Sequence, residues 1–477
     1  MQQTLRQKTV HGLLWSSIER FSVQGINFVV SILIARQLFP SEYGIIAMLF
    51  IFIAVSTSLV DCGFFSALVR KTDRSESDNA TVFYFDILIG FLTMTVLFFS
   101  APLIASFYEI PTLCPMARLV CVVLFFDSFC IVQRALLTAN LDFKTQAKIS
   151  LASVILSGIV GLWLAYAGWG VWALAWQMVT ASFCRSLLFW LFTQWRPVKS
   201  FSKQSFHNLF GFGSKLLLSG LLDSLYKNIY MLVIGKIFSA ASLGNYSRAK
   251  QIAFYPSSNL TDVLQRVTFP VLSTIKEDDE RLCENYRLML RLSAFVVFPL
   301  MIGLVIVAKP LIIWTLTPKW SEAVPLLQII SLSMMWYPIH AINLNLLQVK
   351  GRSDLFLRLE IIRDAIGVLF LCVTIPMGLL AVCWGQVLYS IIGLIINTHY
   401  TGKLIGVGFI RQISDLLPIL LAVLVMSGVV YFFIGWIEKP WVQLFVGILS
   451  GAVVYIGIGW IFKMKELDYI IEIIKRK

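Results

Sequence analysis

The stretch YGIIAMLFIFIAVSTSLVDCGFFSALV at residues 43–69 is uncharged except for Asp61. A helix rises about 1.5 Å per residue, so about 20 apolar residues suffice to cross the roughly 30 Å hydrocarbon core of a bilayer. The stretch therefore predicts a transmembrane helix, and the rest of the chain can be compared with it.

The same pattern recurs along the whole chain on both sides of this stretch. Hydrophobic residues make up 58% of the 477 and charged residues 14%, which is far from the composition of soluble domains. We predict an all-α polytopic membrane protein with about fourteen spans. They cover residues 10–35, 43–69, 80–107, 114–134, 148–167, 170–193, 208–236, 243–273, 287–308, 322–347, 359–376, 378–400, 412–434 and 440–462.

The basic residues follow membrane topology. A formal net charge of +13 is compatible with nucleic-acid binding, but such proteins gather their bases on a solvated face. Here one set of alternate loops, including both termini, holds about 24 Lys and Arg, whereas the other set holds about 5. We therefore predict a bacterial inner-membrane protein with both termini in the cytoplasm, no cleaved signal peptide and no nucleic-acid partner.

The segments between spans leave little room for chemistry outside the membrane. The longest loop on the predicted outer face, 309–321, has about a dozen residues, which disfavours a glycosyltransferase or a polymerase. The eight cysteines form no CxxC pair, and no Gly-rich phosphate loop or nucleophile–base arrangement is present. We expect no enzyme activity, no catalytic residue, no disulfide, no metal site and no cofactor.

A weak repeat at an offset of 200 residues suggests two halves of the same orientation. Ile34, Arg36 and Gly44 correspond to Ile234, Lys236 and Gly244. We predict two six-helix lobes around a central cavity, at 1–200 and 201–400, followed by a helix pair at 401–462 and an amphipathic cytoplasmic tail at 463–477. Segment 194–207 is predicted to be an interfacial helix that links the lobes on the cytoplasmic side.

Charged residues inside the spans are the candidate site, because a charge at mid-bilayer costs about 2.5–3.5 kcal/mol on insertion scales. An excess of bases favours an anionic ligand such as a pyrophosphate, whereas a cation exporter would show the reverse balance. The candidate bases are Arg20, Lys215, Lys227, Arg248, Arg266 and Arg363, and the polar residues beside them are Glu19, Gln24, Asn27, Asp223 and Asn228. Structural ion pairs and snorkelling side chains are the alternative interpretation.

Intramembrane carboxylates leave room for proton or sodium coupling. The coupling candidates are Asp61, Asp127 and His340, and the further acids in the spans are Asp86, Asp262, Glu360 and Asp364. A lone histidine such as His340 is also typical of a hydrogen bond between packed helices.

Several stretches of sequence, taken together in their order, carry a resemblance to a known family. They are ILIARQLFPSEYGIIAM at 32–48, DCGFFSALVR at 61–70, RALLTANLDFKTQAK at 134–148, QWRP at 194–197, LGNYSRA at 243–249, VTFPVLS at 267–273, KWSEAVPLLQII at 319–330 and GRSDLFLRL at 351–359. The chain resembles the polysaccharide flippase family of the multidrug/oligosaccharidyl-lipid/polysaccharide exporter superfamily, near the branch that exports colanic and teichuronic acids.

This resemblance implies fourteen helices and the flipping of undecaprenyl-pyrophosphate-linked oligosaccharide toward the periplasm, for O-antigen, capsule or exopolysaccharide. It also implies a polysaccharide polymerase and assembly machinery as further partners. The family often has an acidic residue shortly before the Ile-Gly-basic segment, but Tyr230 and Met231 stand there in this chain. A cation-coupled multidrug antiporter and a lipid II flippase of the same superfamily remain alternatives, and the glycan cannot be read from the sequence.

Overall fold

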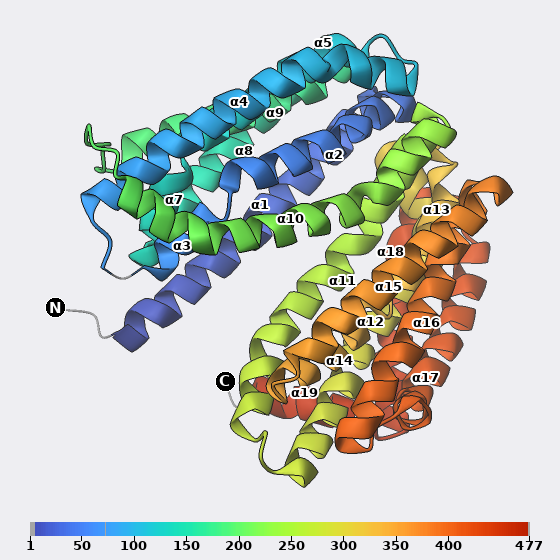
Figure 1. The fold of residues 1–477 in the computed structure, drawn as a ribbon. Helices are drawn as coiled ribbons and strands as arrows, with labels where there is room; N and C mark the ends of the chain where they lie inside the picture. The colour runs from blue at the N-terminus through green and yellow to red at the C-terminus, as the bar shows by residue number, and fades with distance from the viewer. Residues whose placement is uncertain (1–4, 72, 476–477) are drawn as a thin grey trace. The chain divides into compact units, whose positions relative to one another are not determined.

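The helices of the computed structural model follow the apolar stretches of the sequence (Figure 1). The structure describes residues 5–71 and 73–475, without the side chains of residues 5–11, 13, 208, 212, 215, 267, 473 and 474. Contacts within the chain divide it into two compact units. Unit 1 is Met1–Gly244 and unit 2 is Asn245–Lys477, and each is described by itself.

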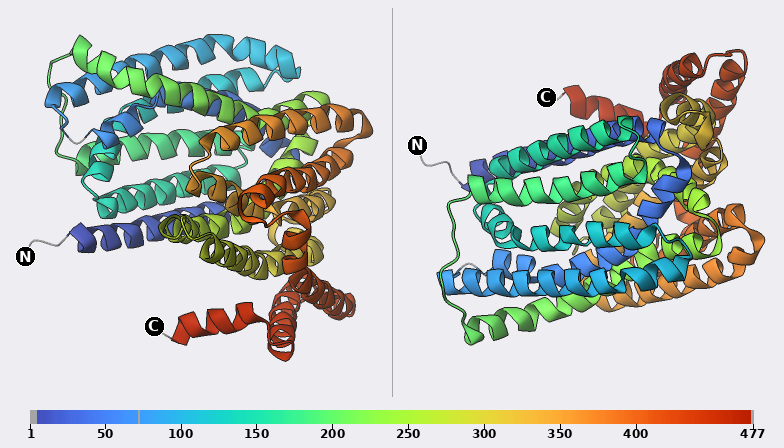
Figure 2. Two further views of the ribbon diagram at one scale, coloured as in Figure 1. Left: turned by 60° about the horizontal axis from the view of Figure 1, so that its bottom comes forward. Right: turned by 90° about the horizontal axis from the view of Figure 1, so that it is seen from above.

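Unit 1 contains ten helices among the described residues. They are α1 (Leu5–Gln37), α2 (Pro40–Asp61), α3 (Phe64–Arg70), α4 (Glu76–Tyr108), α5 (Leu113–Val120), α6 (Val122–Ser128), α7 (Ile131–Ala139), α8 (Phe143–Tyr166), α9 (Val171–Phe192) and α10 (Lys203–Ile237). Helices α1 and α9 both pack against α8, and α10 packs along α2 (Figures 1 and 2).

Unit 2 begins within α11, which starts in unit 1. Its elements are α11 (Ala240–Thr274), α12 (Asp279–Leu316), η1 (Pro318–Trp320), α13 (Ala323–Met334), α14 (Tyr337–Val349), α15 (Ser353–Thr374), η2 (Ile375–Met377), α16 (Leu379–Ile405), α17 (Phe409–Gly435), α18 (Pro440–Ile461) and α19 (Lys465–Lys475). Helices α12, α17 and α18 pack against one another. Helix α13 contacts both α12 and α16.

Helices occupy all fourteen positions predicted to span the membrane, but fewer of them meet the criteria for a span. Among the described residues, nine helices are long and apolar enough, or ten if the bent pair Leu113–Ser128 and Ile131–Ala139 is one span. The other predicted spans fall short for visible reasons. Helix α9 carries Gln177 and Arg185, and α11 is rich in polar residues. Helix α15 carries several charges, and α13 and α14 are separate short helices. The chain is an all-helical multi-pass membrane protein.

The repeat at an offset of 200 residues reappears as a close crossing inside unit 1. Helices α1 and α10 end at Gln37 and Ile237, and α2 and α11 begin at Pro40 and Ala240. A Cβ added to Gly44 would lie 1.7 Å from the Ala240 carbonyl oxygen, and one added to Gly244 would lie 1.8 Å from that of Pro40. Only glycine permits such backbone contact at both places, so we name these residues the glycine crossing.

Helix α2 ends at Asp61, and the chain turns sharply directly after it. Cys62 and Gly63 have φ values of 45° and 71°, which lie in the left-handed region, and α3 then resumes the span. A Cβ on Gly63 would lie 2.7 Å from the carbonyl oxygen of Gly213 on α10. The break and α10 are therefore in close backbone contact, which a larger residue at position 63 would prevent.

The prediction of an interfacial helix over 194–207 is wrong for most of its length. Residues 193–202 are not helical, and α10 begins only at Lys203 with Ser202 as its N-cap. Arg196 donates to the carbonyl oxygens of Trp190, Thr193 and Trp195, and Pro197 follows it. These contacts and the proline favour extended backbone. The tail does form a helix, α19.

Candidate functional site

A polar cavity of about 220 Å³ lies inside unit 1, between α2, α6, α7 and α9. Its charged lining residues are Asp61, Asp127, Arg134 and Arg185. The structure thus brings together two of the three predicted coupling residues, Asp61 and Asp127, and adds two arginines. Two acids and two bases leave the cavity without formal net charge, so pairing within it decides which group is available to a ligand.

Asp127 forms an ion pair and a hydrogen bond within unit 1. Its carboxylate is 2.6 Å from the Arg185 guanidinium and also accepts a hydrogen bond from the Ser182 hydroxyl. Ser182 donates in addition to the Val123 carbonyl oxygen at 3.1 Å. These bonds join α6 to α9, which is the arrangement of a structural ion pair.

Arg134 is the residue that sequence reasoning missed. Its guanidinium lies 4.4 Å from the centre of the Phe65 ring and interacts electrostatically with both Glu19 and Asp61. Its Nε is buried and has no hydrogen-bond partner among the described residues. The predicted span ended at Arg134, so this residue was assigned to a loop. Helix α7 instead continues to Ala139. The apolar residues that follow Arg134 in the sequence could have indicated that the helix continues.

The polar face of α1 lies partly inside unit 1. Ser150 on α8 donates to the Glu19 carboxylate at 2.6 Å, so this acid holds α1 to α8. The side-chain oxygen of Gln24 is buried and has no partner among the described residues. Arg20 and Asn27 are half-buried. The predicted face therefore exists, and it combines one bonded acid with a glutamine that could still accept a hydrogen bond.

The predicted face of α10 is more exposed. Lys227 and Asp223 form an ion pair of 2.7 Å one turn apart, with side-chain exposures of 69% and 56%. Asn228 donates to the Ser224 carbonyl oxygen at 2.8 Å. Ser224 also hydrogen bonds Ser58 of α2 at 2.7 Å, which fixes the rotation of α10 about its axis. The Lys215 side chain lies outside the described part of the structure.

The remaining candidates lie in unit 2 and have different surroundings. Arg248 is buried, donates to Gln251 at 2.7 Å and has the Trp320 ring centre 6.0 Å away, whereas Arg266 is exposed. The half-buried Arg363 has an Nε without a hydrogen-bond partner among the described residues.

His340 is buried in unit 2 and has a hydrogen-bond partner at each ring nitrogen. Its Nε2 lies 3.0 Å from the Ser390 hydroxyl, and its Nδ1 lies 3.2 Å from the Asn397 side-chain nitrogen. Arg363 interacts with it electrostatically. These bonds tie α14 to α16, as expected for a histidine in helix packing.

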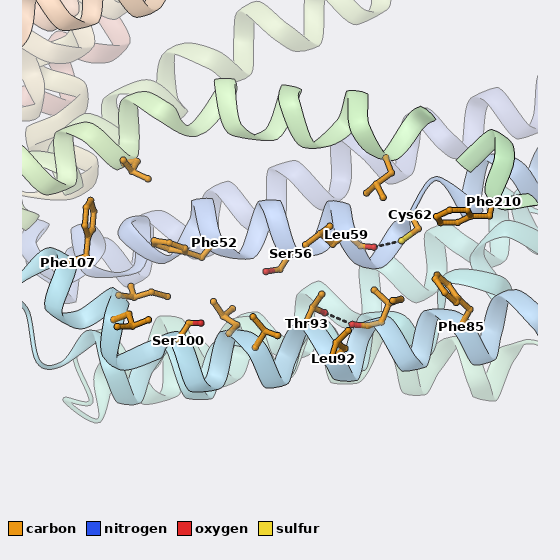
Figure 3. Close-up of a pocket in the computed structure, with 17 residues that line it drawn as sticks. Phe52, Ser56, Leu59, Cys62, Phe85, Leu92, Thr93, Ser100, Phe107 and Phe210 are labelled. Atoms are coloured by element: carbon orange, nitrogen blue, oxygen red, sulfur yellow. Dashed lines mark hydrogen bonds between the residues drawn. The ribbon is translucent and has the colours of Figure 1, made fainter. Parts of the chain in front are cut away.

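A second cavity in unit 1 has the opposite character. It has a volume of about 830 Å³ and lies between α2, α4 and α10 (Figure 3). Along α4 it extends from Phe85 to Phe107, and its few polar groups include Ser56, Thr93 and Ser100. The Thr93 hydroxyl donates to the carbonyl oxygen of Ile89, so it is internally satisfied. A cavity of this composition accepts hydrocarbon rather than a charged group.

Comparison with protein families gives one match that covers most of the chain. The model of a family described as polysaccharide biosynthesis protein matches residues 33–325. The teichuronic acid biosynthesis protein TuaB of Bacillus subtilis is 27% identical over 355 residues, which are 74% of this chain and 73% of TuaB. The lipopolysaccharide biosynthesis protein WzxC of Escherichia coli is 25% identical over 406 residues, 83% of this chain and 80% of WzxC.

Solved structures share the fold at low sequence identity. The lipid II flippase MurJ in an inward closed conformation aligns with a TM-score of 0.79 at 16% identity, over 94% of this chain and 98% of MurJ. An inward-facing multidrug resistance MATE family transporter aligns with a TM-score of 0.63 at 16% identity, over 82% of this chain and 98% of that chain. The helices described above therefore adopt the architecture of these two transporters.

Proposed function

The chain belongs to the polysaccharide biosynthesis protein family, and from this premise we propose that it flips an oligosaccharide linked to undecaprenyl pyrophosphate. The lipid would move from the cytoplasmic to the outer leaflet of the membrane during surface polysaccharide synthesis. Its relatives WzxC and TuaB are named for lipopolysaccharide and teichuronic acid biosynthesis, which agrees with a glycan cargo.

One observation carries this proposal: unit 1 offers two cavities of opposite chemistry. The cavity lined by Asp61 and Arg134 is polar, and the larger one between α2, α4 and α10 is almost entirely apolar. A lipid-linked sugar pyrophosphate has a charged, hydrated head group and a hydrocarbon tail, and its carrier must accommodate both. A substrate that was polar throughout would gain nothing from the second cavity.

The bases inside the membrane are proposed to hold the pyrophosphate. Arg134 joins the candidates because its Nε is buried without a hydrogen-bond partner among the described residues. The other candidates remain those of the sequence: Arg20, Lys215, Lys227, Arg248, Arg266 and Arg363. Arginine and lysine form charge-assisted hydrogen bonds to phosphate oxygens. Moving two negative charges outward across an inside-negative membrane gains roughly 4–5 kcal/mol per 100 mV, at about 2.3 per charge.

We propose fourteen spans in two six-helix lobes and a final pair, with both termini in the cytoplasm. The asymmetry of lysine and arginine between alternate loops supports this orientation. Reporter fusions test it: an alkaline phosphatase fused after residue 477 should be inactive and a cytoplasmic fluorescent reporter active. The reverse result would require an odd number of spans.

Deletion of the gene tests the function itself. We expect loss of surface polysaccharide and accumulation of the lipid-linked oligosaccharide, with unchanged susceptibility to cationic drugs. Normal polysaccharide together with increased drug susceptibility would favour a cation-coupled multidrug antiporter instead. Rescue of a strain depleted of its lipid II flippase would favour lipid II as the cargo.

A further inference from the structure

Asp86 on α4 is a buried carboxylate that no described residue satisfies. Its exposed fraction is 0%, and neither of its carboxylate oxygens has a hydrogen-bond partner. Helix α4 is also one of the candidate membrane spans. A carboxylate that is buried without a partner in such a place takes up a proton rather than remaining ionised.

One charged neighbour adds to this preference. From α2, Asp61 interacts electrostatically with Asp86, and one Asp61 oxygen is also buried without a partner among the described residues. Helix α7 also packs on α4, but its Arg134 interacts with Asp61 and Glu19, and its buried Gln133 carries no charge. A negative neighbour favours the protonated form of Asp86.

The charged groups on the other helices packed against α4 are paired, lie over an aromatic ring, or are exposed at a helix end. On α6, Asp127 is paired with Arg185. On α5, the Arg118 guanidinium lies 4.9 Å from the centre of the Phe98 ring, three turns along α4 from Asp86. On α10, Asp223 is paired with Lys227 and Lys236 with Glu109, while Lys203 and His207 are exposed near the start of the helix. Cys62 follows Asp61 on the α2 side, and it donates to the Leu59 carbonyl oxygen.

A route for the proton starts at the break after α2. Asp61 is the last residue of α2 before the left-handed Cys62 and Gly63, and it also lines the polar cavity. A carboxylate at a helix discontinuity changes its surroundings when the two half-helices move. Asp61 therefore interacts with Asp86 and also lines the cavity, so it can accept a proton and pass it to water.

We propose that Asp86 is a proton-binding site and that Asp61 relays its proton to the polar cavity, which couples transport to a proton gradient. Because Asp86 makes no hydrogen bond to a described residue here, the relay needs the half-helices at the break to move so that a water molecule bridges the two carboxyls. The O–H bond of Asp86 then breaks and its proton passes to this water, while one of the protons of the water forms the O–H bond on Asp61, so that Asp86 becomes the anion. The proton then passes from Asp61 to a water molecule of the cavity. The coupling part of this inference rests on the proposed transport function, whereas proton binding by Asp86 does not.

Infrared spectroscopy of the full-length protein in lipid nanodiscs tests the proton site. At neutral pH we expect a protonated carboxyl band that is lost in Asp86→Asn and kept in Asp127→Asn, because Asp127 is ion-paired. Asparagine has the shape of protonated aspartate, so the variant should fold; Asp86→Glu, which should shift the band, is the second variant. A carboxyl band of Asp86→Asn identical in position and intensity to that of the parent would overturn the site. Loss of the band on replacing choline by sodium at constant pH would overturn it in favour of sodium.

Export by cells tests the coupling. In a strain lacking the native gene, Asp86→Asn should lose surface polysaccharide at normal membrane levels, and Asp86→Glu should recover part of it. Export by Asp86→Asn equal to that of the parent would overturn the coupling. If deleting the gene leaves the polysaccharide intact, the proposed function fails, but the infrared band still decides whether Asp86 holds a proton.

Discussion

Two buried glutamines, one in each unit, have opposite surroundings. In unit 2, the side-chain nitrogen of Gln412 on α17 lies within hydrogen-bond distance of three acceptors: the Tyr286 hydroxyl at 3.0 Å, Asn343 Oδ1 at 3.1 Å and Thr401 Oγ1 at 3.1 Å. These partners come from α12, α14 and α16, so one glutamine joins four helices. In unit 1, the equally buried Gln133 has no hydrogen bond to any described residue.

The part of unit 1 that includes α7 packs through apolar side chains. Its aromatic cluster includes Phe64, Phe85, Phe206 and Phe210, with ring centres 4.9–6.4 Å apart. The glycine crossing fixes the other end of α2 against the start of α11. Val132 and Ala135 of α7 belong to a buried apolar cluster with Phe64, so the packing of this helix does not depend on hydrogen bonds of Gln133. The comparison distinguishes a buried polar residue that joins helices, Gln412, from one that has no hydrogen bond to a described residue, Gln133.

The glycine crossing should give the largest effect on stability. Gly44→Ala places a Cβ against the Ala240 carbonyl oxygen, so α2 and α11 must separate. We expect a loss at or above the upper end of the about 1–3 kcal/mol typical of overpacking. The matched control is Gly220→Ala, whose Cβ meets no atom within 4 Å and should be neutral or stabilising. Thermal unfolding of the purified protein measures both, and equal midpoints would refute the crossing.

The two buried glutamines give the next effect and test the comparison itself. Gln412→Leu should destabilise the protein by about 1–3 kcal/mol, because Tyr286, Asn343 and Thr401 lose a buried partner. Gln133→Leu should be neutral or stabilising, since it removes two atoms that have no partner among the described residues. The same unfolding assay applies. A larger loss for Gln133→Leu than for Gln412→Leu would reverse the comparison.

An exposed ion pair should give the smallest effect. Lys236 is 2.8 Å from Glu109 and lowers the pKa of this exposed carboxyl through its hydrogen bond and charge. Since the folded pKa lies below the unfolded one, any stabilisation is present at neutral pH and is lost as the pH falls through the lowered pKa. We expect Glu109→Gln to leave the unfolding midpoint at pH 7 nearly unchanged. A clear loss that persists in high salt would contradict this.

The positions of the helices could be predicted from the sequence, because a long apolar run has few alternatives in a membrane. Span number was harder: α11 and α15 carry polar residues that a hydropathy test cannot distinguish from loops. Residues 193–202 were assigned to a helix on composition, yet the carbonyl contacts of Arg196 hold them extended.

The candidate site was only partly predictable, because a sequence shows which residues are charged but not which are paired. Asp61 and Asp127 were both proposed as coupling residues, but Asp127 is in an ion pair and one Asp61 oxygen is unsatisfied. Arg134 was missed because it stood at an assumed helix end. Asp86 could not be separated from other acids until its burial was known. Pairing and burial depend on tertiary packing.

The central claim is that bases inside the membrane hold an anionic lipid-linked glycan, and export by base-to-glutamine variants tests it most directly. Each of Arg20, Lys215, Lys227 and Arg266 is replaced by Gln in a strain without the native gene, with Arg118→Gln as the control because Arg118 lies over the Phe98 ring. Surface polysaccharide is measured alongside the membrane level of each variant. We predict that at least one of the four variants is present in the membrane at the normal level but does not export polysaccharide, while the control variant exports it. Normal export by all four would contradict the claim.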